Sequence, residues 1–147
     1  MKGTAYVIWI WGTKEKIILD ALVLGRSLRE TKPRARMIAC VNEDTINANL
    51  HVLLKAYWEI LPVTHLILPD RIVSRGITRL QGVYSKLQVW KYLAHPGDWH
   101  CIRVVMLDVD MLVRGNIDSI FMQEPVAAVL RGCRDNAILE RRELFLG

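Results

Sequence analysis

Short apolar runs alternate with amphipathic stretches along most of the chain. Runs with so few polar interruptions are typical of strands that are buried on both faces of a sheet. They cover residues 6–11, 36–41, 103–108 and 126–130. Segments with helical periodicity separate them, at residues 15–30, 46–58 and 84–94. This alternation of strands and helices predicts an α/β fold, in which helices flank a mainly parallel sheet.

The helical segments also predict which side chains face the core. The inward-facing set comprises Ile18, Ala21, Leu22, Gly25 and Leu28 on the first segment, Leu50, Leu53, Leu54 and Tyr57 on the second, and Leu87, Trp90 and Leu93 or Ala94 on the third. Residues 42–45 are polar and suited to cap the second helix. Residues 59–63 predict a further short strand, in which Pro62 favours an edge position because proline lacks an N–H group.

The apolar run at residues 103–113 contains Asp108 and Asp110, with one valine between them. Side chains two apart on a strand point the same way, so both carboxylates would project near the strand end, where open α/β sheets bind ligands. Two carboxylates in an apolar setting repel each other and lose hydration, so they need a cation. Oxygen ligands favour Mg²⁺ or Mn²⁺. In the plainer interpretation Asp108 caps a turn and Asp110 is solvated.

Length, composition and charge favour a single globular domain. The 147 residues predict one domain, residues 1–147, in which 52% of the residues are hydrophobic and the net charge is +5. Basic residues concentrate at Arg26, Arg29, Lys32, Arg34 and Arg36, and at Arg131, Arg134, Arg141 and Arg142. The first set is most simply a solvated surface, and no interleaved aromatic motif supports nucleic-acid binding.

Cysteine usage and the N-terminal run predict a cytoplasmic protein. Cys40, Cys101 and Cys133 are too few and too scattered for a disulfide framework, and the first two are expected to be buried, reduced thiols. The apolar run at residues 5–11 is too short to span a membrane and lacks a small-residue cleavage site. The tail at residues 131–147 is charged and ends without a closing strand, which predicts a chain truncated at its C-terminus.

Four motifs occur in one order along the chain. They are Ala21-Leu-Val-Leu-Gly25-Arg-Ser27-Leu28, Ser85-Lys86-Leu87-Gln-Val-Trp90, Val105-Met-Leu-Asp108-Val-Asp110-Met-Leu-Val113, and Asn116-Ile117-Asp118-Ser-Ile-Phe121. From about residue 5 to residue 130, this set resembles the N-terminal, nucleotide-sugar-binding half of the glycogenin-like family 8 glycosyltransferases, which have the Rossmann-like GT-A fold.

The resemblance implies a retaining hexosyltransferase that uses a UDP-sugar such as UDP-glucose or UDP-galactose. By it, Asp108 and Asp110 would hold Mn²⁺ (or Mg²⁺) and through it the diphosphate, while Lys86 would contact the donor near its phosphates. The charges agree, because a lysine is a compact cation suited to phosphate. A carbohydrate or protein acceptor and a homodimer are further expectations, with neither nucleic acid nor membrane as a partner.

The chain also departs from the family pattern. Where the family places uridine-binding residues after its first strand, this chain has residues 9–14, in which Trp11 and Thr13 are the candidate donor-binding residues; an apolar tryptophan at a strand end is also typical of a core. The family takes a third metal ligand, a histidine, and its acceptor site from a C-terminal half. None of His51, His65, His95 and His100 falls at a matching position. We therefore expect the donor-binding half alone, with its catalytic residues unassigned.

Other interpretations remain open at this stage. The chain could be a catalytically inactive nucleotide-sugar-binding remnant. In a phosphatase, Asp108 would be the nucleophile and Asp110 the acid, but that chemistry places D-x-D after the first strand. A basic nucleic-acid-binding module would show salt-dependent affinity that is blind to Mn²⁺. In the plainer interpretation Lys86 is a solvated helix lysine, and Asn116 or Asp118 only caps a helical turn.

Overall fold

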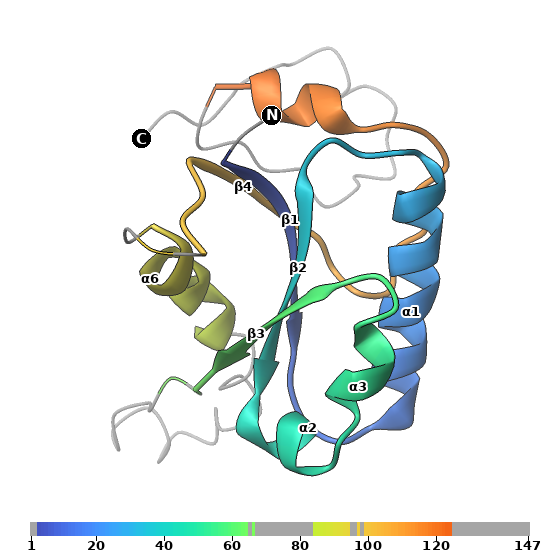
Figure 1. The fold of residues 1–147 in the computed structure, drawn as a ribbon, viewed down its shortest axis with the longest axis vertical. Helices are drawn as coiled ribbons and strands as arrows, with labels where there is room; N and C mark the ends of the chain where they lie inside the picture. The colour runs from blue at the N-terminus through green and yellow to red at the C-terminus, as the bar shows by residue number, and fades with distance from the viewer. Residues whose placement is uncertain (1–2, 65, 67–83, 95–96, 98, 125–147) are drawn as a thin grey trace, which may run out of the picture.

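The computed structural model describes residues 3–64, 66, 84–94, 97 and 99–124. Four strands in this part of the chain form one sheet in the order β3-β2-β1-β4, and all of its pairings are parallel (Figure 1). The strands are β1 (Thr4–Ile10), β2 (Arg36–Asn42), β3 (Glu59–Val63) and β4 (Arg103–Met106). The predicted α/β fold is confirmed. The strand expected at residues 126–130, most of residues 66–80, Cys133 and the tail lie outside the described residues.

The central strand β1 is buried along its whole length, because helices cover both faces of the sheet. Its even-numbered residues, including Tyr6 and Ile8, pack in one cluster with the helix α1 (Glu15–Glu30). Its odd-numbered residues, including Val7, pack in a second cluster with α6 (Val89–Leu93). The alternation follows from the two-residue period of a strand.

Helix α1 has the predicted bounds, and its buried residues include Ile18, Ala21, Gly25 and Leu28. Leu24 is buried where the prediction had Leu22, which is only partly buried. Strand β3 is the outermost strand on one side of the described sheet, and its Pro62 aligns with Val41 of β2. This position agrees with the predicted edge strand, because proline has no N–H group to offer to a further strand.

The single helix predicted for residues 46–58 is wrong. Two short helices occupy this segment, α2 (Glu43–Asn47) and α3 (His51–Leu54). Asn49 separates them with a φ of 56°, a left-handed conformation that asparagine tolerates better than most residues. Leu54 is buried as predicted, whereas Leu53 is exposed. The capping prediction holds, because the Asn42 side chain accepts a hydrogen bond from the Thr45 backbone N–H.

The prediction for residues 84–94 is correct in its helical character and in the burial of Leu93, but wrong in the rest of its inward face. Leu87 and Trp90 are exposed, while Val89 and Leu93 are buried. A 3₁₀ turn, η2 (Lys86–Gln88), interrupts the segment. Such a turn has three residues per turn instead of 3.6, so it rotates the following residues away from the face that a continuous α-helix would present.

Strand β4 is shorter and less buried than its sequence predicts. It ends at Met106, and its residues are exposed or partly buried. Asp108 and Asp110 therefore lie beyond the strand, on a turn at residues 108–110. At the start of β4, the Arg103 guanidinium donates to the backbone carbonyls of Phe121 and Gln123. That contact fixes the 3₁₀ helix η3 (Asp118–Met122) against the sheet.

Asp118 does not cap η3 but joins three distant segments. Its buried carboxylate accepts hydrogen bonds from the Tyr6 hydroxyl at 2.9 Å and the Arg34 backbone N–H at 3.0 Å. Asn116 accepts from the Asp118 backbone N–H at 2.9 Å. Burial alone would raise the pKa of Asp118, but these hydrogen bonds and the Arg34 charge outweigh it and lower the pKa.

Cys40 and Cys101 are free and buried, as predicted, and burial raises the pKa of the Cys40 thiol to about 12. No helix within the described ranges is both long and apolar enough to cross a bilayer.

Candidate functional site

A cleft of about 420 Å³ lies where β1 and β4 end and α1 begins. Its walls come from four places in the sequence. They comprise Trp9, Trp11, Lys16, Ile17, Asp20, Lys86, Leu107, Asp108, Val109 and Asp110. The carboxyl ends of parallel strands are where open α/β sheets bind ligands. The structure therefore brings four of the five sequence-predicted residues, Trp11, Lys86, Asp108 and Asp110, to one cleft at the expected end of the sheet.

Asp108 is held by a cation from this same chain. The Lys86 ammonium lies 2.5 Å from Asp108 Oδ1, and the two side chains are 30% and 66% exposed, respectively. The expectation of an apolar setting for the two carboxylates is wrong, because both aspartates lie on an exposed turn instead of inside a buried strand. Hydration consequently offsets much of the repulsion between the two carboxylates, and the ion pair with Lys86 offsets part of the remaining repulsion.

Asp110 makes no hydrogen bond or ion pair with the described residues, although Lys16 is near enough to feel its charge. Lys16 instead bonds Asp20 one turn further along α1, at 2.6 Å. The bond to Asp20 and the charge of Asp20 raise the pKa of Lys16, and the charge of Asp110 adds to this rise. Sequence reasoning missed both Lys16 and Asp20. Their position in the first turns of the helix that follows β1 was the available signal, since such turns border the ligand end of the sheet.

A glycine turn carries the chain from β1 into α1. Gly12 has a φ of 79°, a conformation that side chains other than glycine rarely adopt. Its N–H donates to Asn42 Oδ1 at 3.3 Å, and its carbonyl lies 2.6 Å from the Thr45 hydroxyl. Both Asn42 and Thr45 are buried, so they anchor the turn to the end of β2. Sequence reasoning assigned residues 42–45 only a capping role.

The anchored turn places Trp11 and Thr13 differently. Trp11 is 38% exposed and lines the cleft, which leaves part of its indole ring accessible to a ligand. Thr13 is also exposed, but it lies on the turn outside the cleft lining. Trp9 is buried beneath the cleft, and its indole N–H has no hydrogen-bond partner among the residues described.

The donor set of the cleft fits a divalent cation only in part. No group of three histidine, cysteine, aspartate or glutamate side chains that could hold a metal occurs in the described ranges. Two aspartates nevertheless suit Mg²⁺ or Mn²⁺, because such ions are often held by one or two carboxylates together with substrate phosphates and water. The residues present therefore fit a cation shared with a phosphate ligand, and they do not form a complete protein cage.

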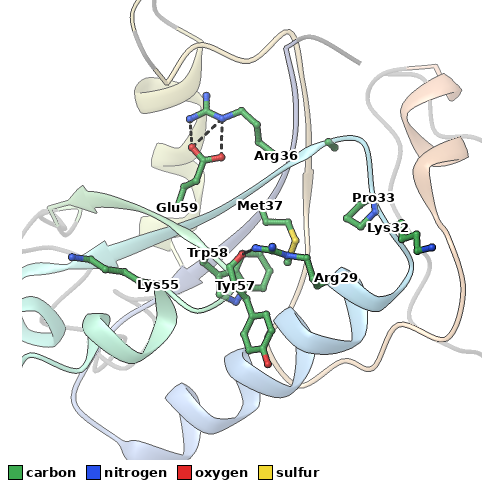
Figure 2. A pocket seen from close by; sticks show the side chains of 10 residues that line it. Arg29, Lys32, Pro33, Arg36, Met37, Lys55, Tyr57, Trp58 and Glu59 are labelled. Atoms are coloured by element: carbon green, nitrogen blue, oxygen red, sulfur yellow. Dashed lines mark hydrogen bonds and ion pairs between the residues drawn. The ribbon is translucent and has the colours of Figure 1, made fainter.

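A second hollow, of about 460 Å³, lies at the opposite end of the sheet, where β2 and β3 begin. Figure 2 shows Arg29 at its centre, near Met37 and Tyr57, with Lys32 and Lys55 extending outward on opposite sides. The strong positive charge of this hollow would attract anions. Two of its cations, Arg29 and Arg36, however, have structural explanations.

Arg36 forms a two-pronged ion pair with Glu59, which joins β2 to β3, and its guanidinium stacks 5.2 Å from the centre of the Trp99 ring. Arg29 donates to the Tyr57 carbonyl at 3.2 Å. Arg29 also lies in the last turn of α1, where a cation interacts favourably with the helix dipole.

Comparisons with known proteins indicate a distant relationship. No protein-family model matches the chain. Inositol phosphorylceramide glucuronosyltransferase 1 of Arabidopsis thaliana is 28% identical over 127 residues, which are 86% of this chain and 22% of the plant protein. An uncharacterised protein of Acanthamoeba polyphaga mimivirus is 27% identical over 131 residues, which are 89% of this chain and 44% of the viral protein.

The chain thus spans less than half the length of either relative. The match to the plant enzyme supports a relationship to glycosyltransferases, at a distance that leaves membership in family 8 a prediction. The α/β fold with its parallel sheet agrees with that relationship.

Proposed function

We propose that this chain forms the donor-binding half of a retaining hexosyltransferase that uses a UDP-sugar such as UDP-glucose or UDP-galactose. The observation that carries the proposal is the gathering of Asp108, Asp110 and Lys86 in one cleft at the carboxyl ends of β1 and β4. The distant similarity to a glycosyltransferase supports it independently. Retention of configuration rests only on the resemblance to the glycogenin-like enzymes.

In this proposal Asp108 and Asp110 hold Mn²⁺ or Mg²⁺, which as a Lewis acid would stabilise the leaving diphosphate when bound. Lys86 contributes a positive charge to the phosphates. The N-terminal end of α1 also borders the cleft, and the positive end of a helix dipole favours an anionic ligand. Trp11 offers an aromatic face against which the base can stack, and Thr13 is close to that position along the turn.

The sugar and the acceptor are proposals about the longer protein. The name of the plant relative specifies a glucuronosyl group and inositol phosphorylceramide. By analogy, the candidate sugars for the longer protein are glucose, galactose and a hexuronic acid. Its candidate acceptors are a carbohydrate, a protein and a phosphorylated lipid. A binding-competent but catalytically inactive chain is the alternative, because no third side chain among the described residues joins Asp108 and Asp110 as a metal ligand.

A nucleotide panel tests the donor class. Melting temperatures are measured with UDP, CDP, ADP and GDP, each with and without Mn²⁺. We expect UDP with Mn²⁺ to raise the melting temperature most, and UDP-sugars to match or exceed UDP. Equal shifts with all four nucleotides would contradict uridine selectivity, and no shift with any of them in a natively folded protein would contradict donor binding altogether.

A further inference from the structure

We propose that Lys86 and the divalent cation exchange places at Asp108, so that the nucleotide and the metal bind cooperatively. The inference rests on the proposed function and concerns the regulation of the same cleft. Before a nucleotide or a metal binds, the Lys86 ammonium forms an ion pair with Asp108. When a nucleotide diphosphate enters, its phosphate oxygens bind the Lys86 ammonium, and the carboxylate of Asp108 becomes available to the metal.

The contact between Lys86 and Asp108 carries the first step of this argument. With 2.5 Å between the ammonium nitrogen and Oδ1, the lysine occupies one of the two carboxylate oxygens of Asp108, a residue that lines the cleft. A divalent ion would bind that oxygen at about 2.0–2.6 Å. Two cations cannot share one oxygen at such distances without strong repulsion. A metal that binds Asp108 through this oxygen in the absence of a nucleotide must therefore displace Lys86.

The setting of Lys86 carries the second step. Its side chain is the less exposed partner of the pair, at 30%, so its charge is less screened than that of a fully solvated lysine. The preceding residue, Ser85, is fully buried and accepts a hydrogen bond from the Leu66 N–H at 2.9 Å. Val89, at the start of α6, is also buried. The backbone on both sides is thus fixed, and an ammonium released from Asp108 stays within reach of the cleft.

Lys16 shows that a lysine in this cleft need not play the same part. It lines the same walls, but its ammonium is bonded to Asp20, and its side chain is 79% exposed. Because Asp20 already neutralises it and solvent screens it, Lys16 does not compete for Asp108. The chain therefore contains a matched control, because Lys86 is bonded directly to an aspartate of the motif, whereas Lys16 is bonded to Asp20 and only senses the charge of Asp110.

Cooperativity follows from linkage, because a nucleotide that draws Lys86 away from Asp108 raises metal affinity, and the metal must then raise nucleotide affinity by the same factor. Replacing Lys86 by an uncharged residue removes the competitor. The Lys86→Met protein should accordingly bind Mn²⁺ alone more tightly than the wild type, bind UDP less tightly, and show a smaller gain in Mn²⁺ affinity when UDP is added.

The experiment is a titration of Mn²⁺ in which the free ion is measured by electron paramagnetic resonance, with and without saturating UDP. The wild type, Lys86→Met, Lys86→Gln and Lys16→Met are compared, after circular dichroism has shown that each is folded. We expect both Lys86 substitutions to tighten Mn²⁺ binding without UDP by about two- to fivefold, as for the loss of one partly exposed ion pair. Lys16→Met should tighten it by clearly less than either Lys86 substitution, because Lys16 acts on Asp110 only at a distance.

Three results would overturn the exchange. The first is unchanged or weaker Mn²⁺ binding by both Lys86 variants. The second is equal tightening of Mn²⁺ binding in Lys16→Met, which would indicate a general effect of charge. The third is a gain in Mn²⁺ affinity on adding UDP that is as large in Lys86→Met as in the wild type. In each case the wild type would still bind Mn²⁺ with UDP, and the proposed function would stand. If the folded wild type bound no Mn²⁺ even with saturating UDP, the metal-dependent function itself would fail, and the exchange with it.

Discussion

The two hollows at opposite ends of the sheet have similar volumes, about 420 and 460 Å³, but they use charged residues in different ways. At the amino ends of the strands, the Arg36–Glu59 pair and the bond from Arg29 to the Tyr57 carbonyl hold elements of the fold together. At the carboxyl ends, Asp110 contributes nothing to the packing of the described residues, and Asp108 bonds only a lysine of the same cleft. An aspartate pair that is tied to the fold only through one lysine of the same cleft is the stronger indication of a ligand site.

This contrast predicts that substitutions near the amino ends change stability and leave ligand binding intact, whereas substitutions in the cleft do the reverse. Asp118→Ala should have the largest effect on stability. It leaves the buried Tyr6 hydroxyl and the Arg34 N–H without their acceptor, and should lower the free energy of unfolding by about 3 kcal/mol. Urea denaturation measures this loss. A loss below about 0.5 kcal/mol would show that Asp118 does not join these segments.

Gly25→Ala should destabilise the protein although alanine favours helices. A Cβ atom at this position would lie 2.5 Å from the Trp58 indole nitrogen and 2.8 Å from Tyr57 Cβ. The indole N–H is itself bonded to the Ala21 carbonyl, so Trp58 cannot move without losing that bond. We expect a net loss of about 1–2 kcal/mol, after a gain of about 1 kcal/mol from helix propensity. Leu19→Ala, on the exposed face of α1, is the control and should be nearly neutral.

The lowered pKa of Asp118 also predicts how the free energy of unfolding depends on pH. Because its pKa is lower in the folded protein than its ordinary value of 3.8, the unfolded chain takes up a proton more readily on acidification. Its contribution is therefore complete above about pH 5 and is lost as the pH falls through the folded pKa. In urea denaturation at pH 7, 4 and 3, the stability gap between the wild type and Asp118→Asn should narrow at the lowest pH. A constant gap would contradict the lowered pKa.

Arg36→Ala should have the smallest effect of these changes. Its ion pair with Glu59 is partly exposed, with side chains 32% and 47% accessible, so solvent screens much of the interaction. A loss of about 0.5 kcal/mol is expected, with UDP and Mn²⁺ affinities unchanged. If Arg36→Ala or Arg29→Ala weakened UDP binding, the hollow at the amino ends would be part of the donor site, and the comparison between the two ends would fail.

The order β1–α1–β2 could be predicted because the pattern of each element is continuous and local. The errors arose where one residue changes the course of the backbone. Asn49, in a left-handed conformation, divides a segment whose apolar spacing suits one helix, and the 3₁₀ turn at residues 86–88 rotates Leu87 and Trp90 outward. Neither change alters the hydrophobic pattern along the sequence.

The site was predictable as far as its motif residues and no further. Lys86 and Asp108 belong to motifs, and the structure pairs them. Lys16 and Asp20 belong to none, and only the junction of α1 with β1 brings them to the cleft. The burial of Asp118 depends on Tyr6, which is 112 residues away along the chain, so no local pattern could distinguish it from a helix cap.

Isothermal titration calorimetry of UDP binding, with and without Mn²⁺, tests the central claim most directly when the wild type is compared with Asp110→Asn. In the wild type, Mn²⁺ should tighten UDP binding, and UDP at 100 times its dissociation constant should stabilise the fold by about 2.7 kcal/mol. Asp110→Asn should lose the Mn²⁺-dependent gain, because an amide carries no net charge, and should retain the stability of the apo protein. If Mn²⁺ tightened UDP binding equally in both folded proteins, Asp110 would hold no metal, and the assignment of this cleft would be wrong.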